Sequence, residues 1–361
     1  MTTVLFLKRK YYYRKESAPY LWKTSSVIGK NILTFGESLE FNTIRFHGLV
    51  FFVFFCFNFI AFAQYDPQFS QNMFNPLPVN AGYAGFSGRT NAVIINRTQW
   101  VGIEGAPKTT VVGADMAVNF LRNKGGVGLV VMNDEIGFFQ NITIQGVLAQ
   151  RYDLGEGELG VGVNLGLVNQ SFDGSKVILK PAAGGNYHQE TDPFVPTTDV
   201  NGFAFDMGFG AWYSRADYYL GFSILHLFAP KPNFKDELDV YIPRSFFLTG
   251  GYNYKFWEKP IELQPSVFLK QSAGSWQMDL NVNLMFQQKY WTGLTYRLQD
   301  AIVLFAGMEL KNGIKIGYSY DITTSALSKA GSNGSHEVMV GYTFDISTEK
   351  REKRYKSVRY L

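Results

Sequence analysis

Residues 159–168 read Leu159-Gly160-Val161-Gly162-Val163-Asn164-Leu165-Gly166-Leu167-Val168, so that apolar side chains alternate with small or polar ones. Successive side chains of a β-strand point to opposite faces, and the pattern therefore predicts a long strand with one apolar face. The same alternation returns at 276–288, 313–323 and 335–346. Strand-like segments follow one another from residue 89 to residue 346.

Working outward in both directions, we count fourteen predicted strands. They are 89–97, 109–118, 125–134, 141–154, 157–172, 201–214, 217–228, 245–256, 261–272, 276–288, 290–299, 301–312, 313–323 and 335–346. The even-numbered connections are tight, whereas the long ones, at 98–108, 173–200, 229–244 and 324–334, are all odd-numbered. Short periplasmic turns and long outer loops would produce this alternation.

One apolar and one polar face fit either a soluble sandwich or a transmembrane barrel. Three features favour the barrel. The predicted strands are long for a globular protein, in which about 5–6 residues is usual. Aromatic pairs such as Trp212-Tyr213 and Tyr290-Trp291 stand at strand ends, as in interfacial girdles. An export leader also precedes the strands. The sequence therefore predicts an all-β fold, a transmembrane antiparallel β-barrel of about 14 strands.

The leader is predicted over residues 1–63. An apolar run of 14 residues, 49–62, is short for a spanning helix and is followed by the cleavage pattern Ala61-Phe62-Ala63. We interpret 45–63 as a signal peptide and 1–44 as an extended or mis-assigned start; an uncleaved anchor is the alternative. Residues 1–63 hold eight Lys/Arg and three Asp/Glu, so their removal takes the formal net charge from +4 to −1. Nucleic-acid binding loses its electrostatic support.

Three further segments complete the expected organisation. Residues 64–88 are irregular and Pro-rich, and we expect them to lie at the periplasmic mouth or to plug a barrel of residues 89–346; a restricted lead-in to the first strand is the alternative. Both termini are expected in the periplasm. The tail, 347–361, has a net charge of +4 and is either solvated or in contact with an acidic partner. The 173–200 loop is either a surface excursion or a partner-contacting loop.

Motifs that suggest chemistry are weak. Gly155-Glu156-Gly157-Glu158-Leu159-Gly160 has the letters of a dinucleotide fingerprint but leads into a strand. His188, His226 and His336 lack zinc-ligand spacing, and His226 lacks the nucleophile context of a Ser–His lipid hydrolase. A cation site at Asp236, Glu237 and Asp239 lacks the EF-hand spacing. We expect no catalytic residues, no cofactor and no metal.

The segment after the leader carries motifs at fixed spacing. The first block comprises Asp66, Pro67, Phe69, Ser70, Gln71, Met73, Asn75 and Pro76, followed by Asn80, Tyr83, Ala84 and Gly85. The second comprises Arg97, Gln99, Trp100, Gly102, Gly105, Ala106, Pro107 and Thr109. Together they resemble the start of the PorP/SprF family of type IX secretion outer-membrane proteins from Bacteroidetes, from which Ala81-Gly82 depart in place of Pro-Ala.

The resemblance implies a non-enzymatic outer-membrane barrel that supports secretion or surface attachment of large adhesin-like proteins, including gliding adhesins. Its implied partners are outer-membrane lipid, periplasmic components of the type IX machinery and a large secreted client. Partner-binding or plug residues would then be Asp66, Pro67, Phe69, Ser70, Gln71, Asn75, Pro76, Asn80, Tyr83, Gly85, Arg97, Gln99, Trp100, Gly102, Gly105 and Pro107. A passive or small-solute channel of the same architecture is the alternative.

Overall fold

A computed structural model describes residues 65–120, 123–177, 196, 198–234 and 240–345. Antiparallel strands dominate it. Their bounds are β1 Thr90–Thr98, β2 Lys108–Phe120, β3 Asn123–Ile136, β4 Phe139–Leu154, β5 Gly157–Asp173, β6 Asp199–Ser214, β7 Tyr218–Leu225, β8 Ser245–Tyr252, β9 Tyr254–Lys255, β10 Ile261–Ser272, β11 Ser275–Phe286, β12 Tyr290–Arg297, β13 Ala301–Glu309, β14 Ile314–Thr323 and β15 Ser335–Phe344. Four short 3-10 turns accompany them: η1 Asn72–Phe74, η2 Ala81–Tyr83, η3 Gly174–Lys176 and η4 Ala326–Ser328.

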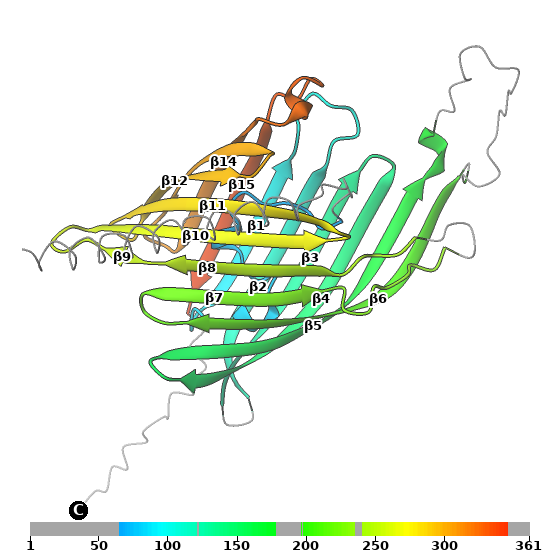
Figure 1. The fold of residues 1–361 in the computed structure, drawn as a ribbon. Coiled ribbons are helices and arrows are strands. Elements are labelled where there is room, and N and C mark those ends of the chain that lie inside the picture. Colours follow the sequence, from blue (N-terminus) through cyan, green and yellow to red (C-terminus); the bar gives the residue numbers. More distant parts are fainter. Residues whose placement is uncertain (1–64, 121–122, 178–195, 197, 235–239, 346–361) are drawn as a thin grey trace, which may run out of the picture. The chain divides into compact units, whose positions relative to one another are not determined.

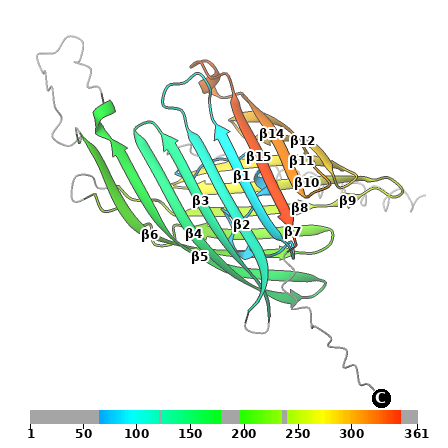
Figure 2. The same cartoon turned by 180° about the vertical axis from the view of Figure 1, so that it is seen from behind.

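The strands form one closed antiparallel barrel (Figure 1). Sequence neighbours pair all the way round, and β15 pairs with β1 from Thr90↔Phe344 to Thr98↔His336, which closes the wall. β9 continues β8 along the same partner strand, β10, so the fifteen assigned strands make a 14-stranded wall. This confirms the predicted fold. Figure 2 shows β1 to β6 and β15 side by side from behind.

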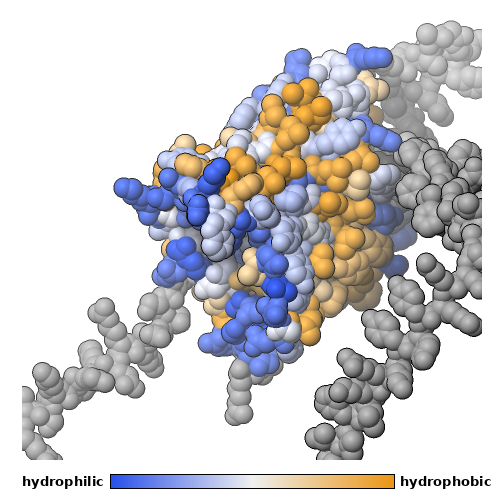
Figure 3. All heavy atoms as spheres, turned by 60° about the vertical axis from the view of Figure 1, so that its left-hand side comes forward, coloured by the Kyte–Doolittle hydropathy of each residue, from blue (hydrophilic) through white to orange (hydrophobic). Residues whose placement is uncertain are grey.

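Side chains alternate between the two faces of the wall as the sequence predicts. In β5, Asn164 is 3% exposed and faces the interior, whereas its neighbour Leu165 is 44% exposed and faces outward. β11 repeats the pattern with Asn281 inside and Val282 outside. Figure 3 shows apolar residues gathered over a broad area of the outer surface on one side. The inward face of the wall therefore carries polar side chains and its outer face apolar ones, which is the reverse of a soluble domain.

The two ends of the barrel differ in their connections. The long ones, which join β1 to β2, β5 to β6, β7 to β8 and β14 to β15, lie at one end, here the long-loop end. The connections after β4, β6, β9, β11 and β13 are short and lie at the other, the turn end. Among the described residues, no helix has the length and apolar character needed to cross a membrane.

Most strand bounds lie within two residues of the prediction, the exceptions being the ends of β7, β8 and β13, and three of the early ends have a backbone cause. β7 ends at Leu225 instead of 228 because His226 adopts a left-handed conformation, with φ of 55°. β11 and β12 end early in the same way, before Gln287 and Gln299, with φ of 52° and 61°. A left-handed φ interrupts a strand. None of these residues is a glycine, the residue type that would have predicted such a φ from the sequence. Residues 1–64 and 346–361 lie outside the described part, and with them the predicted leader and the whole of the predicted tail.

Candidate functional site

Residues 65–86, here the N-terminal segment, run through the barrel interior. The segment begins near the long-loop end, where the Lys270 ammonium donates a hydrogen bond to the Asp66 carbonyl oxygen. It ends near the turn end, where the Gly85 amide donates to the Asp115 carboxylate at 2.8 Å. The chain then turns and enters β1. Apart from η1 and η2 the segment has no regular structure, so side chains of the wall must bind its backbone polar groups.

Ser70 is bound by charged side chains of several strands. Its hydroxyl lies 2.7 Å from the Asp321 carboxylate, and the Arg97 guanidinium donates to that hydroxyl at 2.8 Å. Arg97 and Arg297 both bind Asp321, at 2.7 Å and 2.8 Å. The Glu337 carboxylate accepts hydrogen bonds from the backbone N–H groups of Ser70 and Gln71, at 2.7 Å and 2.8 Å. The segment is thus held by hydrogen bonds to charged groups, which are stronger than neutral ones.

These side chains form one buried charge cluster, built from five strands. Its members are Arg97, Asp279, Arg297, Asp321 and Glu337. Each is at most 1% exposed. Asp279 joins the cluster through Arg297, at 3.1 Å, and also accepts a hydrogen bond from the Gln68 amide at 3.1 Å. Because an unpaired charge in such a place is strongly unfavourable, the cluster and the segment stabilise each other.

A second polar contact lies beside the cluster. The His226 imidazole bridges two carboxylates, with Asp66 at 3.0 Å from Nε2 and Asp206 at 2.9 Å from Nδ1. Burial opposes ionisation of the imidazole, but the two carboxylates outweigh it and raise the pKa of His226 to about 10. Burial likewise opposes ionisation of Asp66, but His226 and Lys270 outweigh it and lower its pKa to about 2. The segment therefore meets the wall here through a charged pair.

The turn-end half of the segment packs closely against the wall. Asn80 donates to the carbonyl oxygens of Ala211 and Phe222, at 3.0 Å and 3.2 Å, and accepts from the Gly82 amide at 2.9 Å. The wall offers glycines at the points of closest approach. A Cβ on Gly162 would overlap the backbone of Ala81. Glycine is what permits two backbones to approach this closely.

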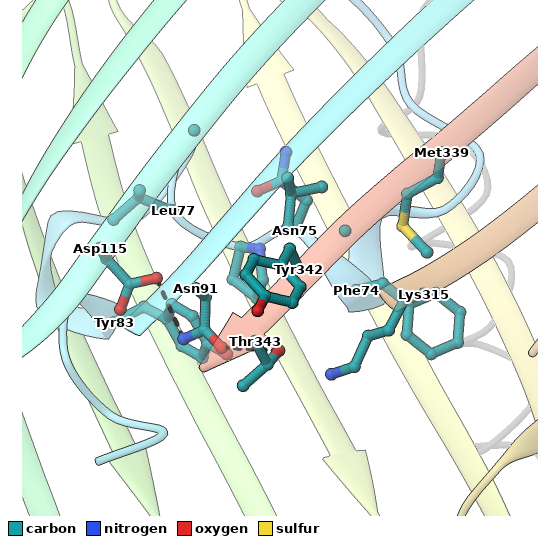
Figure 4. Close-up of a pocket in the computed structure, with 14 residues that line it drawn as sticks. Phe74, Asn75, Leu77, Tyr83, Asn91, Asp115, Lys315, Met339, Tyr342 and Thr343 are labelled. Atoms are coloured by element: carbon teal, nitrogen blue, oxygen red, sulfur yellow. Dashed lines mark hydrogen bonds between the residues drawn. The ribbon is translucent and has the colours of Figure 1, made fainter. Parts of the chain in front are cut away.

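Aromatic and apolar contacts fill the rest of the interior. Phe74 packs against Trp291, with ring centroids 5.0 Å apart, and Tyr83 meets Trp212 edge-on at 5.2 Å. A hollow remains on the side of β14, β15, β1 and β2, where Leu77 and Phe74 face the wall (Figure 4). The segment thus occupies the interior from one end of the barrel to the other.

The predicted site residues fall into two groups. Those of the first block lie inside the barrel: Asp66, Pro67, Phe69, Ser70, Gln71, Asn75, Pro76, Asn80, Tyr83 and Gly85. Arg97 and Gln99 of the second block are also buried, and the Arg97 Nε donates to Gln99 at 3.4 Å. Trp100, Gly102, Gly105 and Pro107 lie instead in the β1–β2 connection at the long-loop end, away from the segment. There the Trp100 amide donates to the Ser335 hydroxyl at 3.0 Å.

Sequence reasoning missed the residues of the wall that bind the segment. Asp279, Arg297, Asp321 and Glu337 all occupy inward positions near the long-loop ends of their strands. A charged residue at a lumen-facing position is not unusual by itself. The useful signal is that all four residues lie at the same distance along the barrel axis, near the long-loop end. This shared position becomes visible only when the strand registers are known.

The arrangement around His226 does not resemble that of a hydrolase. Both ring nitrogens already face carboxylates, and the nearby Ser223 hydroxyl donates to the Val79 carbonyl oxygen at 2.5 Å. Nδ1 of His336, on β15, lies 2.6 Å from the hydroxyl of Tyr318 on the neighbouring strand β14. His188, Asp236, Glu237 and Asp239 lie outside the described residues. Within the described ranges, no group of three His, Cys, Asp or Glu side chains is arranged to hold a metal ion.

The fold and the filled interior define a class, the outer-membrane β-barrels with an internal segment of their own chain. The model of the family described as "Type IX secretion system membrane protein PorP/SprF" matches residues 61–342. The chain belongs to this family, as the motifs predicted, and is an outer-membrane barrel of the type IX secretion system.

Other comparisons add little. A search of curated proteins found no match. Among solved structures, the translocator domain of the autotransporter NalP from Neisseria meningitidis is 13% identical, with a TM-score of 0.38 over 71% of this chain and 88% of that one. The P. putida toluene transporter TodX is 9% identical, with a TM-score of 0.40 over 74% and 92%. The KdgM porin is 9% identical, with a TM-score of 0.32 over 70% and 99%. Likeness this low carries no argument about function.

Proposed function

We propose that this protein docks other components of type IX secretion at the outer membrane and supports the secretion or surface attachment of a large adhesin-like client. Family membership supplies the secretion system. The observation that carries the docking mechanism is the filled interior, because the N-terminal segment is bound by charged groups at one end and by close backbone packing at the other. A barrel built in this way offers surfaces for partners rather than a path for solutes.

Orientation follows from the connections. Transmembrane barrels of bacteria have short periplasmic turns and longer outer loops. The turn end would then face the periplasm. There Arg89, just before β1, pairs at 2.8 Å with Asp345, just after β15. In this orientation the turn end and the basic tail, 347–361, would contact periplasmic components of the machinery. The long-loop end, with the β1–β2 connection of the family motif, would hold the exported client.

The alternative of a passive or small-solute channel requires an open interior. The contacts of Phe74, Tyr83 and Asn80 with the wall argue against it in the described structure. Gliding motility is a narrower version of the proposal, in which the client is a motility adhesin. It predicts that loss of the protein stops surface movement as well as secretion.

The direct experiment is a pull-down of the tagged protein from detergent-solubilised outer membranes, with mass spectrometry of the co-purified proteins. We expect large surface proteins or periplasmic type IX components. A strain that produces the chain without residues 65–86 should assemble the barrel but fail to export the client. Normal export by that strain, or recovery of the full-length barrel alone, would refute the docking mechanism.

A further inference from the structure

A small cavity lies where the N-terminal segment begins. It is lined by Tyr65, Asp66 and Pro67 of the segment, together with apolar and polar inward residues of β3 and β4 and the His226 region. Its volume is about 20 Å³, which is room for one water-sized particle. The cavity therefore separates the start of the segment from the wall at the height of the buried charge cluster.

Oxygen atoms without partners line this cavity. The Asn141 side chain of β4 is 6% exposed, and its Oδ1 accepts no hydrogen bond. Oδ2 of Asp66 is likewise unpartnered, as is the hydroxyl of Tyr65. Behind them, Oδ1 of Asp206 and Oδ1 of Asn164 are also buried without a partner. Buried polar atoms are normally satisfied, so a cluster dominated by acceptor oxygens indicates a missing donor or cation.

The charges around the cavity do not balance. Three carboxylates are present: Asp66, Asp134 and Asp206. Two cations oppose them, the His226 imidazolium at 3.0 Å from Asp66 and the Lys270 ammonium on the Asp66 carbonyl. One negative charge remains. A water molecule would bring two donors but no charge, whereas one monovalent cation would satisfy the oxygens and cancel the excess.

We propose that the cavity binds one monovalent hard cation, Na⁺ or K⁺, between the N-terminal segment and the wall. The unpartnered side-chain atoms of the described residues that line the cavity are oxygens, the ligands that hard cations prefer. Two carboxylates line the cavity, Asp66 and Asp134, and the Asn141 amide and Tyr65 hydroxyl complete the donor set. A divalent ion would leave a net positive charge in a buried site. The bound ion ties Asp66 of the segment to β3 and β4.

Thermal unfolding of the full-length protein in detergent tests this site independently of secretion. The midpoint is measured in choline chloride and as NaCl, KCl or CaCl₂ replaces it at constant ionic strength. We expect a saturable rise of a few degrees with Na⁺ or K⁺. An equal midpoint in choline chloride would overturn the proposal, and a response to Ca²⁺ alone would overturn the monovalent assignment.

Two asparagines provide a matched pair of variants. Asn141→Leu removes the unpartnered oxygen from the cavity and should abolish the Na⁺ or K⁺ response. Asn283→Leu makes the same change at another inward position, where Oδ1 is also buried and unpartnered but lies outside the cavity. The response should survive there. A response that persists in Asn141→Leu would contradict the site.

Crystals of the unaltered protein soaked in thallium(I) salts provide a direct readout that needs no variant. Thallium(I) replaces K⁺ and scatters anomalously. The proposal predicts an anomalous peak within coordination distance of Asp66 and Asn141. An empty cavity, or density that behaves as water in every salt, would overturn it.

Discussion

Gly126 of β3 lies directly against the carbonyl group of Ala84, so that a Cβ on this glycine would overlap the Ala84 carbonyl oxygen. The neighbouring residue, Gly85, has φ of 73° and places its amide on Asp115. The turn-end part of the N-terminal segment therefore depends on the absence of a side chain at Gly126, as it does at Gly162. The wall binds this part of the segment by close backbone packing as well as by hydrogen bonds.

Substitution at this glycine should dislodge the segment. We expect Gly126→Ala to destabilise the folded protein by about 1–3 kcal/mol, because the added methyl group overpacks a close backbone contact. Gly113→Ala is the matched control, since a Cβ there would be at an ordinary 3.5 Å from Asn75. Urea unfolding in detergent compares the two. Equal stability of both variants would show that the Ala84 contact does not constrain the wall.

The buried charge cluster should be far more sensitive than exposed ion pairs. Asp321→Asn removes the carboxylate shared by Arg97 and Arg297, and leaves two buried guanidinium groups with one fewer counter-charge. We expect a loss of about 3–5 kcal/mol. Arg89→Ala, which breaks the exposed pair with Asp345, should cost about 0–1 kcal/mol. The free energies of unfolding of the two variants, measured side by side, test this contrast. An Asp321→Asn protein as stable as the unaltered protein would contradict it.

The bridge at His226 predicts a pH dependence. Its raised pKa means that the charged pair stabilises the fold fully below pH 6.5 and loses this contribution as pH rises through about 10. The lowered pKa of Asp66 means that its contribution is present above pH 3.8 and lost as pH falls through about 2. The melting temperature should therefore decline between pH 7 and pH 11. His226→Gln should lack this part of the decline, and identical profiles for the two proteins would contradict the bridge.

The strands could be predicted from the sequence because their pattern is local. Alternation in segments such as 157–172 reports one apolar and one polar face whatever the rest of the chain does. Strand ends at Gln287 and Gln299 could not be predicted, since their left-handed backbone is imposed by turns and not by residue type. The break between β8 and β9 at Asn253 has a different cause, which is also non-local: the Asn253 amide donates to the Asp217 carbonyl oxygen of a neighbouring turn.

Only half of the candidate site could be predicted from the sequence. The motif around Ser70 is recognisable, but the wall residues that bind it come from distant strands, as when Arg97 meets Asp321 across 224 positions. Such a contact depends on closure of the barrel, in which β15 pairs with both β1 and β14 in a fixed register. The sequence also leaves two placements for residues 64–88, at the mouth or in the interior, since both satisfy a polar and irregular segment. The contacts of residues 65–86 with inward side chains of the wall become visible only in the structure.

Ion conductance across a planar lipid bilayer tests the central claim most directly, which is that this barrel is closed by its own N-terminal segment and acts through docked partners. Purified full-length protein and the chain without residues 65–86 would be compared in the same membrane. The account predicts a nearly closed full-length barrel and steady conductance once the segment is removed. Steady conductance by the full-length protein, unchanged by the deletion, would contradict it and favour a channel.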